Sequence, residues 1–143
     1  MIGFVGQYEH QMDPKGRINL PSAFRRQAEG ERFVLMQWEK DNLTLFPQAK
    51  WEELQVELLD FRRKNPKGAN QLRRMVANAV EVVTDKQGRI LVPASLQSGA
   101  GLAGAVLLVG AIDRIEVWSP ETYGSSVEGD GGDLGDFAHQ LFG

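Results

Sequence analysis

The chain has 143 residues, the length of one ordinary domain or of two very small units that share a core. With 42% hydrophobic and 24% charged residues it has a globular composition, and because it has no cysteine it contains no disulfide framework, thiolate metal site or cysteine nucleophile. The net charge of −3 argues against general nucleic-acid binding, although residues 1–75 hold 13 Lys or Arg against 10 Asp or Glu and residues 76–143 hold 3 against 9.

The first half of the chain predicts a short β unit. A strand over 5–12 leads into the turn 13–16, where Pro14 fixes φ and Gly16 supplies a positive φ. Pro21 is suited to the first turn of a helix. The further elements expected here are a strand over 17–20, a helix over 22–28 and a hairpin of strands over 33–37 and 42–46.

Two helices are expected in the middle of the chain. Apolar residues recur at helical spacing between 47 and 64, and Pro66 and Gly68 then interrupt the pattern. A second helix is expected over 69–79. The second half then repeats the β unit, with strands or short helices over 80–84, 89–92, 93–97, 105–110 and 114–118.

The last segment, 124–143, is rich in glycine and acidic residues. It buries too little apolar surface to offset the entropy of ordering it, so we predict a disordered tail.

An internal repeat connects the two halves. At a constant offset of 72, residues 13–51 match residues 85–123 with nine identities in 39 positions, and the apolar segments stay in register without a gap, so that 33–36 align with 105–108. We divide the chain into repeat 1 (1–51), two connecting helices (52–79), repeat 2 (80–123) and the tail. Since neither copy is large enough to close a core, we expect a mainly β fold with some α, in which the copies form one pseudo-two-fold β-barrel flanked by helices.

The doubled Asp-x-x-Gly-Arg turn, with Glu9 and Glu81 upstream and a proline downstream, resembles the MraZ family of bacterial transcriptional regulators. The segments AVEVVTDKQGRILVP and VLLVGAIDRIEVW extend the resemblance over roughly residues 1–123. It implies two AbrB/SpoVT-like modules of the swapped-hairpin type in one chain, assembled into a homo-oligomeric ring. It also implies a repressor that binds direct repeats in double-stranded DNA, in the promoter of its own division and cell-wall gene cluster, and is associated with the nucleoid.

The residues of the two turns carry the candidate site. From spacing alone, Arg17 and Arg89 either form ion pairs that fix their turns or contact DNA, and the resemblance favours the second interpretation. The proposed DNA-binding residues are Lys15, Arg17, Arg25, Lys86 and Arg89, and the residues expected to orient the loops are Asp13, Gly16, Asp85 and Gly88. Repeat 2 carries Gln97 where repeat 1 has Arg25 and the family commonly has Arg.

Other functions find little support in the sequence. The two histidines lie 129 positions apart, and neither a metal-ligand spacing nor a nucleophile motif is present, so we expect no enzyme, no metal, no cofactor and no small-molecule substrate. No apolar stretch approaches the roughly 20 residues of a membrane helix, and no secretory signal is visible, so a cytoplasmic protein without a membrane partner is expected. The alternative function is a ring-forming scaffold for protein interactions, in which DNA binding is secondary or lost.

Overall fold

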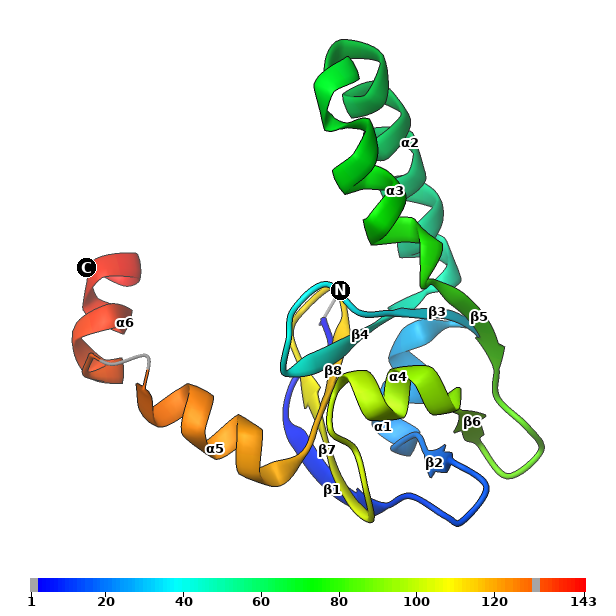
Figure 1. Cartoon of the computed structure of the whole chain (residues 1–143). Helices are drawn as coiled ribbons and strands as arrows, with labels where there is room; N and C mark the ends of the chain where they lie inside the picture. Colours follow the sequence, from blue (N-terminus) through cyan, green and yellow to red (C-terminus); the bar gives the residue numbers. More distant parts are fainter. Residues whose placement is uncertain (1–2, 130–131) are drawn as a thin grey trace.

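The computed structural model describes residues 3–129 and 132–143 of the chain. A body of short β-strands carries two long helices that rise from one side, while two further helices lead away at the C-terminal end (Figure 1). In chain order the elements are β1 (Gln7–Gln11), β2 (Arg17–Asn19), α1 (Ser22–Ala28), β3 (Arg32–Met36), β4 (Asn42–Pro47), α2 (Gln48–Lys64), η1 (Pro66–Gly68), α3 (Ala69–Ala77), β5 (Val80–Val83), β6 (Arg89–Leu91), α4 (Ala94–Gly99), β7 (Ala105–Gly110), β8 (Ile115–Trp118), α5 (Pro120–Gly129) and α6 (Leu134–Phe142).

The strands exchange partners between the two repeats. A six-stranded antiparallel sheet has the order β1-β7-β8-β4-β3-β5, and β2 pairs with β6 in a separate ladder. The first strand of each repeat pairs with the other repeat, β1 with β7 and β5 with β3. Exchanging each strand with its counterpart in the other repeat (β1 with β5, β3 with β7, β4 with β8) gives the same order read from the opposite edge of the sheet. This symmetry agrees with the predicted duplication.

The pairing also locates the pseudo-two-fold axis. Ile18 pairs with Ile90 at the centre of the β2–β6 ladder, and Thr44 pairs with Glu116 between β4 and β8. The two residues of each pair are related by the repeat offset, and equivalent positions face each other only where a two-fold axis crosses the ladder. The axis therefore runs through both sheets.

One segment departs from the gap-free alignment of the repeats. Gln11 pairs with Ala105, whereas its counterpart Val83 pairs with Arg32, so Ala105 occupies the place of Arg32 and not that of Phe33. The predicted match of 33–36 with 105–108 is therefore wrong by one residue. The shift has a physical reason, because it matches Phe33 and Leu35 with Val106 and Leu108, and all four side chains are fully buried.

A single core takes side chains from both repeats. Ile18, Phe24 and Phe33 from the first repeat and Ile90 and Leu108 from the second belong to the same buried cluster. Neither repeat therefore encloses a core by itself.

Helices α2 and α3 form a hairpin that projects from the strand body (Figure 1). Their bounds agree with the predicted helices within two residues, and α1 coincides with the predicted helix over 22–28. Trp51 and Leu54 at the base of α2 pack against a small buried cluster of Val34, Met36 and Phe46 in the sheet. No side chain of α2 or α3 is itself fully buried.

The predicted tail contains helical segments among its described residues, and its disorder stays a prediction. Residues 124–129 continue α5, and α6 follows from Leu134; residues 130 and 131, which the prediction also covers, lie outside the described residues. Local hydrogen bonds explain both helix starts. The N–H of Thr122 donates to Ser119 Oγ at 3.2 Å, and the N–H of Gly135 donates to Asp133 Oδ1 at 3.1 Å.

The predicted closure into a β-barrel stays a prediction. In the described part of the chain, β2 and β6 pair with each other and not with the six-stranded sheet. The antiparallel strands and the flanking helices agree with the predicted class. The domain boundaries stay predictions as well.

Candidate nucleic-acid interface

The first candidate turn, residues 13–17, connects β1 to β2 and is organised by one carboxylate. Asp13 Oδ1 accepts hydrogen bonds from the backbone N–H of Lys15 at 3.0 Å and of Arg17 at 2.8 Å. Asp13 Oδ2 accepts a hydrogen bond from Arg17 Nε at 2.7 Å. The same side chain thus fixes the backbone of the turn and the direction of the guanidinium. The Nη groups of Arg17 have no hydrogen-bond partner among the described residues.

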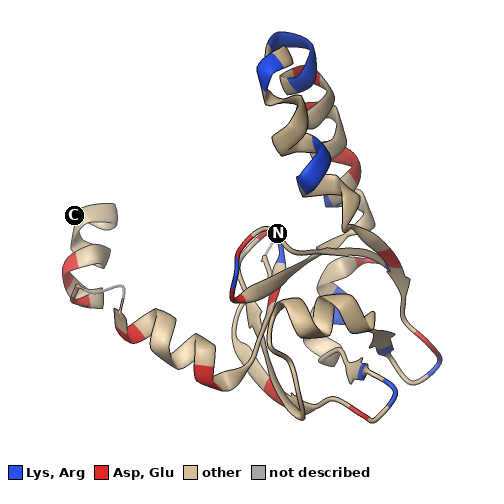
Figure 2. Cartoon of the chain, viewed as in Figure 1, with Lys and Arg blue, Asp and Glu red and all other residues tan. Residues whose placement is uncertain are grey.

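The second turn, residues 85–89, repeats this geometry. Asp85 Oδ1 accepts hydrogen bonds from the N–H of Gln87 and of Arg89, both at 2.9 Å, and Oδ2 accepts one from Arg89 Nε at 2.8 Å. Arg89 Nη1 also lies 4.0 Å from Asp13 Oδ2 of the first turn. The two turns are therefore neighbours, and Figure 2 shows their charged tips at the same end of the molecule.

Backbone hydrogen bonds join the two turns. The N–H of Leu20 donates to the carbonyl of Gly88, and the N–H of Val92 donates to the carbonyl of Gly16, both at 2.9 Å. Both glycines have a positive φ, +88° at Gly16 and +77° at Gly88, as the sequence predicts for the turns. The turns thus form one unit that spans both repeats.

Arg25 and Gln97, which occupy equivalent positions in α1 and α4, each hydrogen-bond within their own repeat and pack over the turn of the other repeat. Arg25 Nε donates to the carbonyl of Leu20 at 3.2 Å, and Gln97 Nε2 donates to the carbonyl of Val92 at 2.8 Å. The guanidinium of Arg25 lies over Gly88, so closely that a Cβ there would fall 2.7 Å from its Cζ. Gln97 lies over Gly16 in the same way.

This crossing was not visible in the sequence. Gln97 keeps the hydrogen bond of Arg25 but not its charge, and the charge of Arg25 lies at the turn of repeat 2. The turn that carries fewer basic residues of its own therefore receives one from repeat 1. The offset of 72 equates positions 25 and 97, but only the exchange of strands shows on which turn each side chain lies.

The pKa values of both carboxyl groups are lowered from the usual 3.8. The main cause is the hydrogen bond from the backbone N–H, of Arg17 to Asp13 and of Arg89 to Asp85, and the guanidinium groups add to it. Partial burial acts in the opposite direction at each site. Both carboxylates are therefore ionised at neutral pH and keep their arginines oriented.

The turns remain open to a ligand. The side chains of Arg17 and Arg89 are 32% and 25% exposed, and Lys15 and Lys86 are exposed at the tips. The predicted site comprises five basic residues and two acidic ones, a local charge of +3 in a chain of net charge −3. The structure thus brings all nine predicted site residues together at one end of the strand body.

A second charged cluster, not anticipated from the sequence, stabilises the fold. The guanidinium of Arg114 lies 4.9 Å from the ring centroid of Phe46 and 5.6 Å from that of Trp38. Arg114 Nε donates to Asp113 Oδ1 at 2.8 Å, and this hydrogen bond lowers the pKa of Asp113. The cluster ties the β7–β8 hairpin to β4 and lies outside the candidate interface.

Within residues 3–129 and 132–143, no three His, Cys, Asp or Glu side chains are grouped as metal ligands. Across the same ranges, no helix combines the length and the apolar character needed to span a membrane.

Comparisons with known proteins find one family twice in the chain. A family model described as "MraZ protein, putative antitoxin-like" matches residues 4–74 and 75–129. The "Transcriptional regulator MraZ" of Leuconostoc citreum is 41% identical over 123 residues, which cover 85% of this chain and 85% of that protein. The proteins of the same name from Leuconostoc mesenteroides and Carboxydothermus hydrogenoformans are 40% identical over 121 residues (84% and 83% covered) and 35% identical over 126 residues (88% and 87% covered).

Proposed function

Because the chain belongs to the MraZ family of transcriptional regulators, we propose that it binds DNA sequence-specifically through the turns 13–17 and 85–89. The observation that carries the proposal is the pair of neighbouring arginines, each held by a carboxylate of its own turn. Family membership also agrees with the prediction that the chain is not an enzyme.

The geometry of each arginine suits direct recognition of a base. The hydrogen bonds from Arg17 and Arg89 to Asp13 and Asp85 use only Nε, so the Nη groups can form the two parallel hydrogen bonds that a guanine edge or a phosphate accepts. Holding the side chain before binding reduces the entropy lost when the contact forms. Arg17 and Arg89 therefore provide the specific contacts.

The remaining cations of the site suit the DNA backbone. Lys15 and Lys86 lie exposed at the tips of the turns, and Arg25 lies beside the second turn. Such residues contact phosphates, which adds affinity and fixes the register of the protein without selecting a sequence.

The proposal includes self-association into a ring and repression of the chain's own division and cell-wall gene cluster. One pair of turns makes few contacts and binds weakly. A ring that displays several pairs binds direct repeats in the promoter much more tightly, because each further contact is made at a high effective concentration. The fold within this proposal is the AbrB/SpoVT-like module of the swapped-hairpin type.

The test is fluorescence anisotropy with the promoter fragment from upstream of the chain's own gene and with a shuffled fragment, over a salt series. A bidentate arginine contact is worth about 1–3 kcal/mol of discrimination, so Arg17→Ala/Arg89→Ala should weaken binding to the native fragment at least about 30-fold. It should also reduce the slope of log affinity against log salt by about 2.

The control is Lys40→Ala, which removes a positive charge from an exposed position outside the two turns and outside the α2–α3 hairpin. This variant should keep the preference for the native fragment. Equal, weak binding of the wild type to both fragments would contradict the proposal and favour the protein-interaction scaffold. Unfolding of the Arg17→Ala/Arg89→Ala variant in a thermal scan would instead assign the arginines a structural role.

A further inference from the structure

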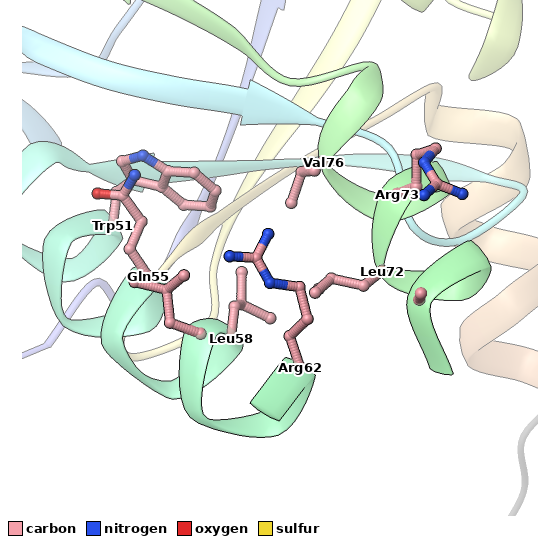
Figure 3. A pocket seen from close by; sticks show the side chains of 9 residues that line it. Trp51, Gln55, Leu58, Arg62, Leu72, Arg73 and Val76 are labelled. Carbon is pink, nitrogen blue, oxygen red and sulfur yellow. The ribbon is translucent and has the colours of Figure 1, made fainter. Parts of the chain in front are cut away.

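An apolar groove runs between α2 and α3. Figure 3 shows Trp51, Leu58, Leu72 and Val76 lining it from the two helices, with the side chain of Arg62 extending between them. Arg73 lines it from α3. Its apolar side chains are accessible, since Leu58 and Leu72 are only half-buried and Val76 is exposed.

The outer half of this hairpin is strongly basic. Residues 62–74 contain six Lys or Arg and no Asp or Glu. Figures 1 and 2 show this end of the hairpin on the opposite side of the strand body from the turns 13–17 and 85–89. A ligand of the groove would therefore leave the proposed DNA-binding turns free.

The C-terminal helices have the complementary character. Residues 119–143 contain five Asp or Glu and no Lys or Arg. In α6 the residues Leu134, Phe137 and Leu141 recur at i, i+3 and i+7 and so share one face, while Asp133 lies beside it at the start of the helix. These three side chains are 78%, 55% and 60% exposed, which is unusual for large apolar residues that share a helix face.

We propose that α6 of one copy of the chain docks in the α2–α3 groove of a second copy. The apolar face of the helix covers Leu58, Leu72 and Val76, and the acidic C-terminal segment lies against the basic outer half of the hairpin. A short amphipathic helix laid in an apolar groove is a recurrent mode of recognition, and charge complementarity fixes its orientation.

The occupant is a second copy because the helix and the groove of one chain lie apart. Figure 1 shows α5 leading away from the strand body and α6 beyond it, separated from the hairpin. Tyr123 in α5 packs edge-on against Trp118 with ring centroids 5.4 Å apart, and this contact attaches the start of α5 to the strand body. Each copy thus presents a groove and an apolar helix to different neighbours, and a head-to-tail contact of this kind closes into a ring when its rotation permits.

This inference rests on the self-association included in the proposed function. The chain has no cysteine, so single cysteines report one contact each. Two full-length variants are mixed under mild oxidation: Leu141→Cys, which carries one affinity tag, and Leu58→Cys, which carries a different tag. The matched controls are His139→Cys, on the opposite face of α6, and Val56→Cys, which is exposed and does not line the groove.

We expect a disulfide-linked product that carries both tags, formed at least about tenfold more than with either control, a ratio that corresponds to about 1.4 kcal/mol. Its yield should fall as salt is raised from 0.1 to 1 M, since the Debye length shortens from about 10 to about 3 Å. A yield of this product no greater than that of the controls would overturn the proposal. A second test dilutes the double variant Leu58→Cys/Leu141→Cys with the cysteine-free protein. A disulfide that forms only within one chain in this mixture would also overturn the proposal. Preferential crosslinking of Leu141→Cys to Lys15→Cys would place the tail on the DNA-binding turns and would overturn it too.

A mass measurement separates this proposal from the proposed function. Phe137→Ser/Leu141→Ser should lower the mass of the assembly in light scattering, while His139→Ser/Gln140→Ser should not. If both variants and the wild type form the same assembly and bind the promoter alike, the groove proposal fails and the DNA-binding function stands. If the wild type assembles as proposed but shows no preference for the promoter, the function fails and the contact stands.

Discussion

Replacing Gly16 by alanine introduces two separate costs at the first turn. The residue has a φ of +88°, a left-handed conformation that costs an L side chain about 1 kcal/mol or slightly more. The new Cβ would also collide with Gln97 Nε2 and lie 3.0 Å from the carbonyl oxygen of Val92. Gln97 must then move and lose its hydrogen bond to Val92, which is worth about 1 kcal/mol. We expect Gly16→Ala to lower the free energy of unfolding by about 2–3 kcal/mol.

Three further glycines separate these costs. Gly101 has a φ of +64° with open space around its Cβ position, so Gly101→Ala should cost only the conformational term of about 1 kcal/mol. At Gly88 the obstacle is the flexible end of Arg25, so Gly88→Ala should cost about 1–2 kcal/mol. Gly30 lies outside the left-handed region and has open space, so Gly30→Ala should change stability by less than about 0.5 kcal/mol.

Urea denaturation of the four variants measures the order. The slope of the free energy against urea should stay constant, so that the midpoints report stability alone. If Gly16→Ala proved no less stable than Gly101→Ala, the contact with Gln97 and Val92 would not constrain the turn. The same series in the DNA-binding assay should show that Gly30→Ala binds like the wild type.

Two other predictions concern the charges of the turns. The pKa values of Asp13 and Asp85 are lowered in the folded state, so the stability that the two carboxylates contribute is complete above the unfolded value of 3.8 and is lost as the pH falls through the lowered folded values. The Asp13→Asn/Asp85→Asn variant should therefore lose less stability than the wild type over this acidic range. Equal losses in urea titrations at several pH values would disprove this linkage. Arg25→Gln copies the residue that stands at position 97, so it should keep the hydrogen bond to Leu20 and change stability by less than about 0.5 kcal/mol. Its affinity for the promoter should nevertheless fall about three- to tenfold at low salt, and unchanged affinity would show that Arg25 serves only the fold.

The sequence predicted most elements because local signals specify them. Pro21 before α1, Gly16 and Gly88 in the turns, and the spacing of apolar residues in α2 each act within a few residues. The Asp-x-x-Gly-Arg spacing likewise indicated the bond from carboxylate to arginine that both turns contain.

The misaligned segment and the placement of Arg25 depend on tertiary contacts. Every residue of 33–36 and of 105–108 is apolar, so the pattern tolerates a shift of one residue, and only the ladder with β1 or β5 decides it. Arg25 lies on the turn of the other repeat because the strands are exchanged, which the alignment of the two copies does not encode. The tail was expected to be irregular because its composition was weighed without the capping side chains Ser119 and Asp133.

The joined turns change how the unequal charge of the repeats is to be understood. Repeat 2 has only Lys86 and Arg89 near its turn, which by itself suggests a weaker contact with DNA. Yet the backbone of each turn is bonded to the other repeat, and Arg25 adds its charge to the second turn. A change in either repeat therefore alters both turns, and the effects of Gly16→Ala and Arg25→Gln on DNA binding should not be additive, since residues that share partners couple by about 0.5–3 kcal/mol. The proposed DNA-binding unit is thus the pair of turns, and neither repeat supplies it alone.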